Sequence, residues 1–207
     1  MKTLFYIAFS VMLMACSGDK KPVKPSENQE VVKTLNFDKS AAKVNWTAYK
    51  FTERVGVSGT FKTLNLTGKL FGNTIETALK DTQFEIPVES VFSANPERDK
   101  KLVELFFGKM SATDAITGQI NELTGDDKKG SCKVSISMNN VTKNCQLEYH
   151  QLGQKYVLKG LINLEDWKAQ TAIASLNETC KELHKGKDGT SKLWPDVKLT
   201  IELPFRY

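Results

Sequence analysis

Residues 196–205 read DVKLTIELPF, and this stretch decides the fold class of the chain. Its apolar positions are Val197, Leu199, Ile201, Leu203 and Phe205. Its polar positions are Asp196, Lys198, Thr200 and Glu202. Alternation with a period of two is typical of a β-strand that has one buried and one solvated face. Because only one face is apolar, the pattern favours an antiparallel sheet with a single dry side.

The same alternation recurs in three earlier segments. Their apolar positions are Val44, Trp46 and Ala48, then Phe84, Ile86 and Val88, and finally Cys132, Val134, Ile136 and Met138. Turn signals separate the predicted strands, namely Gly56 to Gly59, the polar loop 125–130, Asn139-Asn140 and Gly153-Gln154. Many antiparallel strands in one domain leave edges exposed, and closing the sheet into a barrel removes those edges.

Two segments lack the period-two alternation of the strands and predict short helices. In residues 95–107, Asn95 is suited to capping, Pro96 to the first turn and Gly108 to the end. Residues 168–184 carry apolar side chains at spacings of three and four, namely Ala172, Ile173, Leu176, Cys180 and Leu183. The sequence therefore predicts an all-β protein with one or two short helices.

The amino terminus has the layout of a bacterial lipoprotein signal. Lys2 precedes an apolar run from Leu4 to Leu13, which is short for a bilayer span of ~20 residues. The stretch Leu13-Met14-Ala15-Cys16 looks like a lipobox, which implies cleavage after Ala15 and acyl chains such as palmitate on Cys16. Two or three acyl chains anchor a protein stably, at ~0.8 kcal/mol per buried CH₂. The alternative is an ordinary signal peptide with a chance cysteine.

These features divide the chain into three parts. We expect a lipoprotein signal peptide in residues 1–15, lipidated Cys16 with a flexible tether in residues 16–34, and a folded domain in residues 35–207. The tether assignment rests on a polar composition with two prolines and no periodicity. The anchor predicts a location in the cell envelope, on the outer membrane facing the periplasm or on the cell surface.

Composition and charge argue against several classes of function. The chain is 40% hydrophobic and 26% charged, which is typical of a globular domain. Its net charge of +5 is mild and spread out, so no nucleic-acid partner is expected. The two histidines, His150 and His184, have no ligand-type neighbours, which argues against a metal site and a serine–histidine triad. Oligomeric state stays open.

Three cysteines remain for a disulfide bond once Cys16 carries lipid: Cys132, Cys145 and Cys180. If the Asn139-Asn140 turn centres a hairpin, Cys132 opposes Leu147 and Cys145 opposes Val134. The first two cysteines are then diagonal neighbours, a register that does not favour a bridge. A single bridge of unknown pairing and three buried thiols both stay open.

Five ordered pieces of the chain carry a family resemblance. They are VNWTAYK (44–50), VSGTF (57–61), RDKKL (98–102) before Phe106-Phe107, MNNVTK (138–143) and WPDV (194–197). Together they resemble the YceI-like family, lipocalin-like proteins of the bacterial envelope. Lys50 and Lys100 stand where many relatives have histidine, so a contact made by such a histidine cannot be carried over unchanged. A lysine there could instead hold an anionic head group.

The resemblance implies both a fold and a ligand class. It implies an eight-stranded antiparallel, lipocalin-like barrel over residues 35–207, with an elongated apolar interior. Relatives bind polyisoprenoids, isoprenoid quinones, or fatty acids and their amides. The expected partner is therefore an apolar lipid, with no cofactor besides such a bound isoprenoid or fatty-acid-like molecule. Each buried five-carbon isoprene unit would contribute on the order of 2–4 kcal/mol before ordering costs.

The predicted ligand-lining residues combine the alternation with this resemblance. They are Val44, Trp46, Ala48, Lys50, Phe61, Phe84, Ile86, Val88, Phe106, Phe107, Val134, Ile136, Met138, Leu147, Val197, Leu199 and Ile201. The alternative is that these side chains fill a solid core. Trp167 and Trp194 are interpreted as end plugs. Arg98 and Asp99 are interpreted as charged groups that fix a loop through hydrogen bonds.

Three functions fit the sequence. The first is a non-enzymatic protein that carries or sequesters a long apolar lipid in the cell envelope. The second is an envelope scaffold or adhesion module with a filled core. The third, a lipid-modifying enzyme, is disfavoured because the sequence shows no metal cluster, nucleophile motif or histidine-based acid–base pair. We therefore expect a binding protein without catalytic residues.

Overall fold

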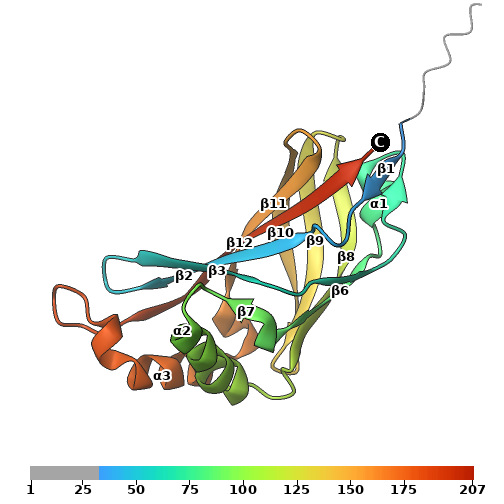
Figure 1. The fold of residues 1–207 in the computed structure, drawn as a ribbon. Coiled ribbons are helices and arrows are strands. Elements are labelled where there is room, and N and C mark those ends of the chain that lie inside the picture. The colour runs from blue at the N-terminus through green and yellow to red at the C-terminus, as the bar shows by residue number, and fades with distance from the viewer. Residues whose placement is uncertain (1–32) are drawn as a thin grey trace, which may run out of the picture. The chain divides into compact units, whose positions relative to one another are not determined.

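A strongly curved antiparallel sheet dominates residues 33–207, which the computed structural model describes (Figure 1). The longer strands are β2 (Lys43–Lys50), β3 (Val55–Phe61), β6 (Gln83–Pro87), β8 (Ala115–Gly125), β9 (Lys129–Met138), β10 (Val141–Gln151), β11 (Lys155–Asn163) and β12 (Leu193–Arg206). The shorter strands are β1 (Leu35–Phe37), β4 (Asn65–Thr67), β5 (Phe71–Gly72) and β7 (Val91–Phe92). The predicted signal peptide, Cys16 and nearly all of the predicted tether lie outside the described residues.

The strand order makes the sheet a half-barrel. Its order is β4-β6-β8-β9-β10-β11-β12-β2-β3-β7, while β1 pairs with β12 and β5. The predicted all-β class with short helices is confirmed, but the strand number differs, because eight longer strands are joined by four short ones. The region between Phe61 and Gln83 breaks into short pieces, since Leu70 and Asp81 adopt positive φ angles of 56° and 63°. No hydrogen-bonded pairing joins β4 to β7 within the described sheet.

Short helices gather at the two ends of this sheet. They are α1 (Ile75–Leu79), α2 (Pro96–Lys101) and α3 (Gln170–Thr179), with tighter 3-10 turns at Val88–Ser90, Phe107–Lys109, Leu164–Trp167 and Lys181–His184 and a π turn at Leu102–Phe106. The predicted cap is present, because the Asn95 side chain accepts a hydrogen bond from the Arg98 backbone N–H at 3.0 Å. Figure 1 shows α2 and α3 near each other and α1 at the opposite end. Among these helices none is long and apolar enough to span a bilayer.

Two local predictions were wrong. Gly56 to Gly59 lie inside β3, and the chain reverses before them, at residues 51–54, where Phe51 and Arg54 have positive φ angles. Gly59 is opposite Trp46, and a Cβ atom there would collide with the indole ring, so the glycine is needed for packing rather than for a turn. Val88 lies beyond β6, because the chain leaves the sheet at Pro87.

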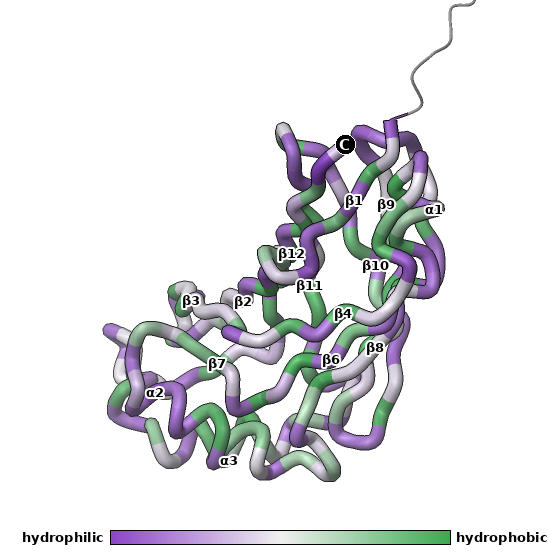
Figure 2. Tube along the Cα trace, turned by 45° about the vertical axis from the view of Figure 1, so that its right-hand side comes forward, coloured by the Kyte–Doolittle hydropathy of each residue, from purple (hydrophilic) through white to green (hydrophobic). Residues whose placement is uncertain are grey.

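The β9–β10 hairpin follows the sequence prediction closely. Asn139 and Asn140 form its turn with φ angles of 51° and 56°. Cys132 opposes Leu147 and Cys145 opposes Val134, as the predicted register requires. Figure 2 shows hydrophobic and hydrophilic residues alternating along the strands of the curved sheet, which is the pattern that gives it a dry inner face.

Candidate functional site

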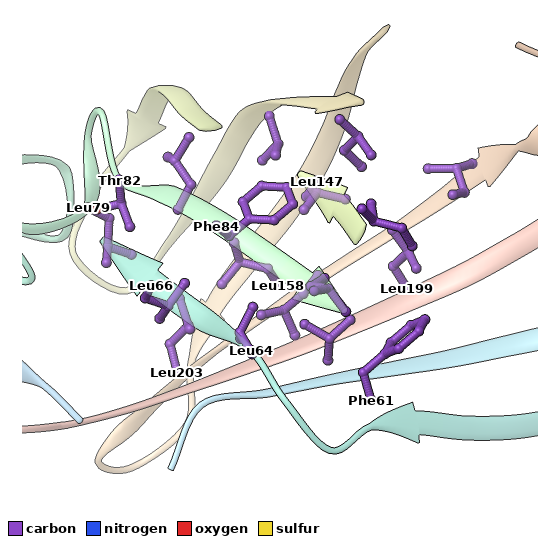
Figure 3. A pocket seen from close by; sticks show the side chains of 18 of the residues that line it. Phe61, Leu64, Leu66, Leu79, Thr82, Phe84, Leu147, Leu158, Leu199 and Leu203 are labelled. Atoms are coloured by element: carbon purple, nitrogen blue, oxygen red, sulfur yellow. The ribbon is translucent and has the colours of Figure 1, made fainter. Parts of the chain in front are cut away.

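An apolar cavity, here called the inner chamber, lies inside the curve of the sheet (Figure 3). It is lined by Val44, Phe61, Leu64, Leu66, Leu79, Thr82, Phe84, Ile86, Ile116, Ile120, Val134, Ile136, Met138, Leu147, Leu158, Ile162, Leu199, Ile201 and Leu203. Every lining residue except Thr82 is hydrophobic. The empty space between the wall atoms is about 850 Å³, a figure that includes space open to solvent.

A second apolar cavity, the middle chamber, adjoins the first. It is lined by Trp46, Ala48, Tyr49, Phe61, Val91, Leu102, Phe106, Phe107, Ile116, Met138, Ile162, Leu164, Ile173, Leu176, Leu193, Trp194, Val197 and Leu199. The two chambers share Phe61, Ile116, Met138, Ile162 and Leu199. The middle chamber measures about 800 Å³ on the same basis. The two chambers therefore adjoin each other along these five apolar residues.

A third, more polar cavity, the vestibule, continues from the middle chamber. It is lined by Trp46, Ala48, Tyr49, Lys50, Val57, Asn95, Glu97, Arg98, Lys101, Leu102, Leu176, Cys180, Leu183, His184 and Leu193. Six of these residues also line the middle chamber: Trp46, Ala48, Tyr49, Leu102, Leu176 and Leu193. We refer to the inner chamber, the middle chamber and the vestibule together as the tract.

A cluster of aromatic side chains packs at the α1 end of the sheet. Its rings are Phe37, Tyr149, Tyr156 and Phe205, with centroid separations of 5.2–6.1 Å between neighbouring rings. The Tyr149 and Tyr156 hydroxyls donate to the carbonyls of Asp126 and Asp127 in the β8–β9 loop, at 2.8 and 2.6 Å. None of the four rings lines a chamber, although Leu203 of the same strand as Phe205 does. This cluster is a solid core beyond the inner chamber.

The structure places the predicted lining residues unevenly along the tract. Those in the inner chamber are Val44, Phe61, Phe84, Ile86, Val134, Ile136, Met138, Leu147, Leu199 and Ile201. Those that line only the middle chamber or its border with the vestibule are Trp46, Ala48, Phe106, Phe107 and Val197, while Lys50 lines the vestibule. Val88 is buried but lines none of the three cavities. Contact of these residues with a ligand stays a prediction.

The two tryptophans interpreted as end plugs have different surroundings. Trp194 lines the middle chamber, and its Nε1–H donates to the Phe51 carbonyl at 2.7 Å. Trp167 is 1% exposed and donates to the Ile136 carbonyl at 2.9 Å, outside the chamber walls. Trp167 is therefore part of the solid core beside the hairpin turn.

Sequence reasoning missed about half of the chamber walls. Leu158, Ile162, Ile116 and Ile120 follow a period of two within β11 and β8, so alternation could have found them. Leu66 and Leu79 come from short elements without such a pattern, and Leu64 comes from the segment that precedes β4. From α3, Ile173 and Leu176 were predicted as helix-face residues but not as chamber walls.

Thr82 is the one polar residue of the inner chamber. Its Oγ1 atom is buried and has no hydrogen-bond partner among the described residues. Burying an unpaired hydroxyl costs roughly 1–3 kcal/mol. We therefore predict that Thr82→Val, which keeps the side-chain shape, raises the free energy of unfolding of the lipid-free protein by about 1 kcal/mol. Urea unfolding measures this change.

Thr113→Val is the matched control for that substitution. The Thr113 hydroxyl donates to the Ser111 carbonyl at 3.0 Å and accepts from the Asn139 backbone N–H at 2.9 Å. Removing a satisfied buried hydroxyl is expected to lower the free energy of unfolding by about 1–2 kcal/mol. Equal losses in the two variants would contradict the assignment of Thr82 as an unpaired group.

The cysteines of residues 33–207 are free, and two of them are poor nucleophiles. Cys132, Cys145 and Cys180 are all free thiols. Burial raises the pKa of Cys132 to about 12, and burial together with the Asp166 charge raises the pKa of Cys145 to about 11. Both are thus poor nucleophiles at neutral pH. The described residues contain no group of three or more His, Cys, Asp or Glu side chains that could hold a metal ion.

Asp99 has the loop-fixing role predicted for the Arg98-Asp99 pair. Its Oδ1 atom accepts from the Ser93 backbone N–H at 2.8 Å and from the Ser93 hydroxyl at 2.6 Å. These bonds attach α2 to the segment that follows β7. Arg98 instead lines the vestibule.

Comparisons with solved structures identify the fold. A polyisoprenoid-binding domain from Saccharophagus degradans, implicated in plant cell wall breakdown, is 16% identical, with a TM-score of 0.58 over 83% of this chain and 97% of that one. BcnA of Burkholderia cenocepacia is 13% identical, with a TM-score of 0.58 over 83% of this chain and 100% of its own. The Campylobacter jejuni YceI protein is 19% identical, with a TM-score of 0.53 over 76% of this chain and 90% of its own. At these identities the likeness shows the fold alone.

Comparison at the sequence level identifies the family. No curated protein matches the chain. The model of the YceI-like domain, however, matches residues 35–205, which include every wall of the tract. The chain therefore belongs to the YceI-like family.

Proposed function

We propose that this protein binds a long apolar lipid, such as a polyisoprenoid, an isoprenoid quinone or a fatty acid or its amide, and carries or sequesters it without altering it. The observation that carries the proposal is the pair of adjoining chambers with almost wholly hydrophobic walls. Such walls stabilise an alkyl tail through burial, at roughly 25 cal/mol per Å² of apolar surface. They offer few polar contacts, which suits a ligand recognised mainly by its tail.

The similarity to the Saccharophagus degradans domain, which is a polyisoprenoid-binding domain, supports the ligand class. The absence of a metal-type cluster and of an activated thiol among residues 33–207 gives no reason to propose a reaction. A scaffold with a filled interior is the competing function, and it predicts that the chambers hold no lipid in the cell.

Lipid extraction from the native protein tests the proposal. The full-length protein is purified without added lipid, extracted with organic solvent, and the extract is analysed by mass spectrometry. A stoichiometric isoprenoid or fatty-acid-like molecule is the expected result. Acyl chains attached covalently to the protein stay with the polypeptide and do not enter the extract. An empty extract, together with no uptake of added lipid, would favour the scaffold.

We further propose that acyl chains on Cys16 anchor the protein in the cell envelope, on the outer membrane facing the periplasm or at the surface. The proposal rests on the sequence Leu13-Met14-Ala15-Cys16. We expect Cys16→Ser to move the protein out of the membrane fraction and into the fraction that is not bound to membranes, because the thiol that receives the lipid is lost. Cell fractionation with immunoblotting measures this. Membrane retention equal to that of the unmodified chain would contradict the anchor.

A further inference from the structure

Three cationic side chains converge on the vestibule from distant parts of the chain. Lys50 ends β2, whereas Arg98 and Lys101 belong to α2. All three line the vestibule and are partly buried. The Lys50 ammonium donates to the Leu183 carbonyl at 3.1 Å, which holds it beside the turn that carries His184.

The three cations have no carboxylate partners among the described residues. The ion pairs within residues 33–207 are Arg54–Asp196, Lys100–Glu104, Lys155–Glu202 and Lys185–Glu182. Glu97 is the only acidic residue that lines the vestibule, and it is solvent-exposed. One carboxylate against three cations leaves the vestibule with an excess of positive charge.

His184 responds to this charge. Burial, followed by the charges of Lys50 and Lys101, lowers the pKa of His184 to about 4. Its Nδ1 atom lies 3.0 Å from the Asn177 Oδ1 atom, so the neutral ring donates to that amide oxygen. Lys50 and Lys101 therefore both lie close enough to the 181–184 turn to act on His184.

The arrangement along the tract gives these charges a role. The two chambers hold hydrophobic walls, and the unpaired cations gather only beyond the middle chamber. A neutral lipid such as a quinone or an alcohol would leave them unpaired, whereas an anionic group would form charge-assisted hydrogen bonds with them. The vestibule shares six wall residues with the middle chamber, so a head group bound there would lie next to a tail in the chambers.

We propose that the lipid held by this protein carries an anionic head group, a carboxylate or a phosphate, which Lys50, Arg98 and Lys101 bind in the vestibule while the tail occupies the chambers. This inference rests on the proposed lipid-binding function and names the ligand's chemical class. Because it rests on Lys50, Arg98 and Lys101, the preference is a property of this chain's own residues.

Matched pairs of lipids that differ only in head-group charge test the inference. The purified full-length protein, stripped of lipid on a hydrophobic resin, is titrated with hexadecanoate or hexadecan-1-ol, and with farnesyl phosphate or farnesol. Trp46 and Trp194 line the middle chamber, so their fluorescence reports occupancy. At low salt we expect each acid to bind at least ten-fold more tightly than its alcohol, with a smaller ratio at high salt. A preference within only one pair supports the inference and identifies the head group.

Substitutions separate this inference from lipid binding in general. The variant Lys50→Gln, Arg98→Gln, Lys101→Gln is expected to bind each acid about as weakly as its alcohol, with alcohol affinity unchanged. Lys100 is a second candidate for the head-group contact in the sequence, but it is exposed, pairs with Glu104 at 3.8 Å and does not line the vestibule. Lys100→Gln is therefore the matched control. Alcohol binding also shows that the triple variant is folded. Equal binding of acids and alcohols by the unmodified protein would overturn the inference, whereas no binding of any probe would overturn the proposed function.

Discussion

Replacing Ala48 by phenylalanine is expected to weaken lipid binding at least ten-fold, which corresponds to about 1.4 kcal/mol or more. Ala48 lines both the middle chamber and the vestibule, so its side chain lies where a bound tail would pass between them. A phenyl ring at this position fills space that the ligand needs. Because the ring enters existing free volume, the loss of stability is expected not to exceed the range for overpacking, about 1–3 kcal/mol. Fluorescence titration with hexadecanoate measures the change in affinity.

Thr47→Phe is the matched control for this substitution. Thr47 is the next residue of β2, and its side chain faces the other side of the sheet, where its hydroxyl lies 2.8 Å from that of Ser58. It lines none of the cavities of the tract. We expect Thr47→Phe to bind lipid like the unmodified protein. Unchanged affinity in Ala48→Phe would show that lipid does not occupy the middle chamber.

Replacing Trp167 by alanine is expected to give the largest loss of stability, about 3–5 kcal/mol. The indole is almost completely buried and lies outside the chambers, so no ligand can fill the space that it leaves. Its Nε1–H donates to the Ile136 carbonyl of β9, and its own carbonyl accepts from the Asn139 side chain at 2.8 Å. Trp167 thereby joins the Leu164–Trp167 turn to the β9–β10 hairpin. Urea unfolding of the lipid-free protein measures the effect.

Trp167→Phe separates packing from hydrogen bonding at this position. It keeps most of the aromatic volume but removes the Nε1–H donor, so we expect a loss of about 1–2 kcal/mol. If Trp167→Ala lowered the free energy of unfolding by no more than Trp167→Phe does, the packing of the indole would not be its main contribution to stability. Lipid affinity is expected to stay unchanged in the phenylalanine variant, since Trp167 lines no chamber.

The strands could be predicted from sequence because side chains in a strand point alternately to its two faces. Val134, Ile136 and Met138 were assigned to one face by spacing alone, and all three line the inner chamber. The pairing of Cys145 with Val134 followed from the position of the Asn139-Asn140 turn. In both cases, local geometry determines the outcome, and no distant contact is needed.

Other features depend on contacts that a local pattern does not contain. The alternation Phe84, Ile86, Val88 continues in sequence beyond the strand, but the chain leaves the sheet at Pro87 and turns at Val88–Ser90. Whether the interior is solid or hollow depends on the summed volumes of side chains from many elements. An apolar residue in a filled core and one in a chamber wall look the same in the sequence. The convergence of Lys50 with Arg98 and Lys101 likewise requires the folded chain.

The aromatic cluster of Phe37, Tyr149, Tyr156 and Phe205 has a consequence for selectivity among ligands. The four rings pack against one another and line none of the chambers, so under the proposed function a tail that enters from the vestibule would end in the inner chamber, short of these rings. A hydrocarbon that is too long would keep its last carbons in water, while one that is too short would leave part of the walls bare. The protein would then bind lipids selectively according to their chain length.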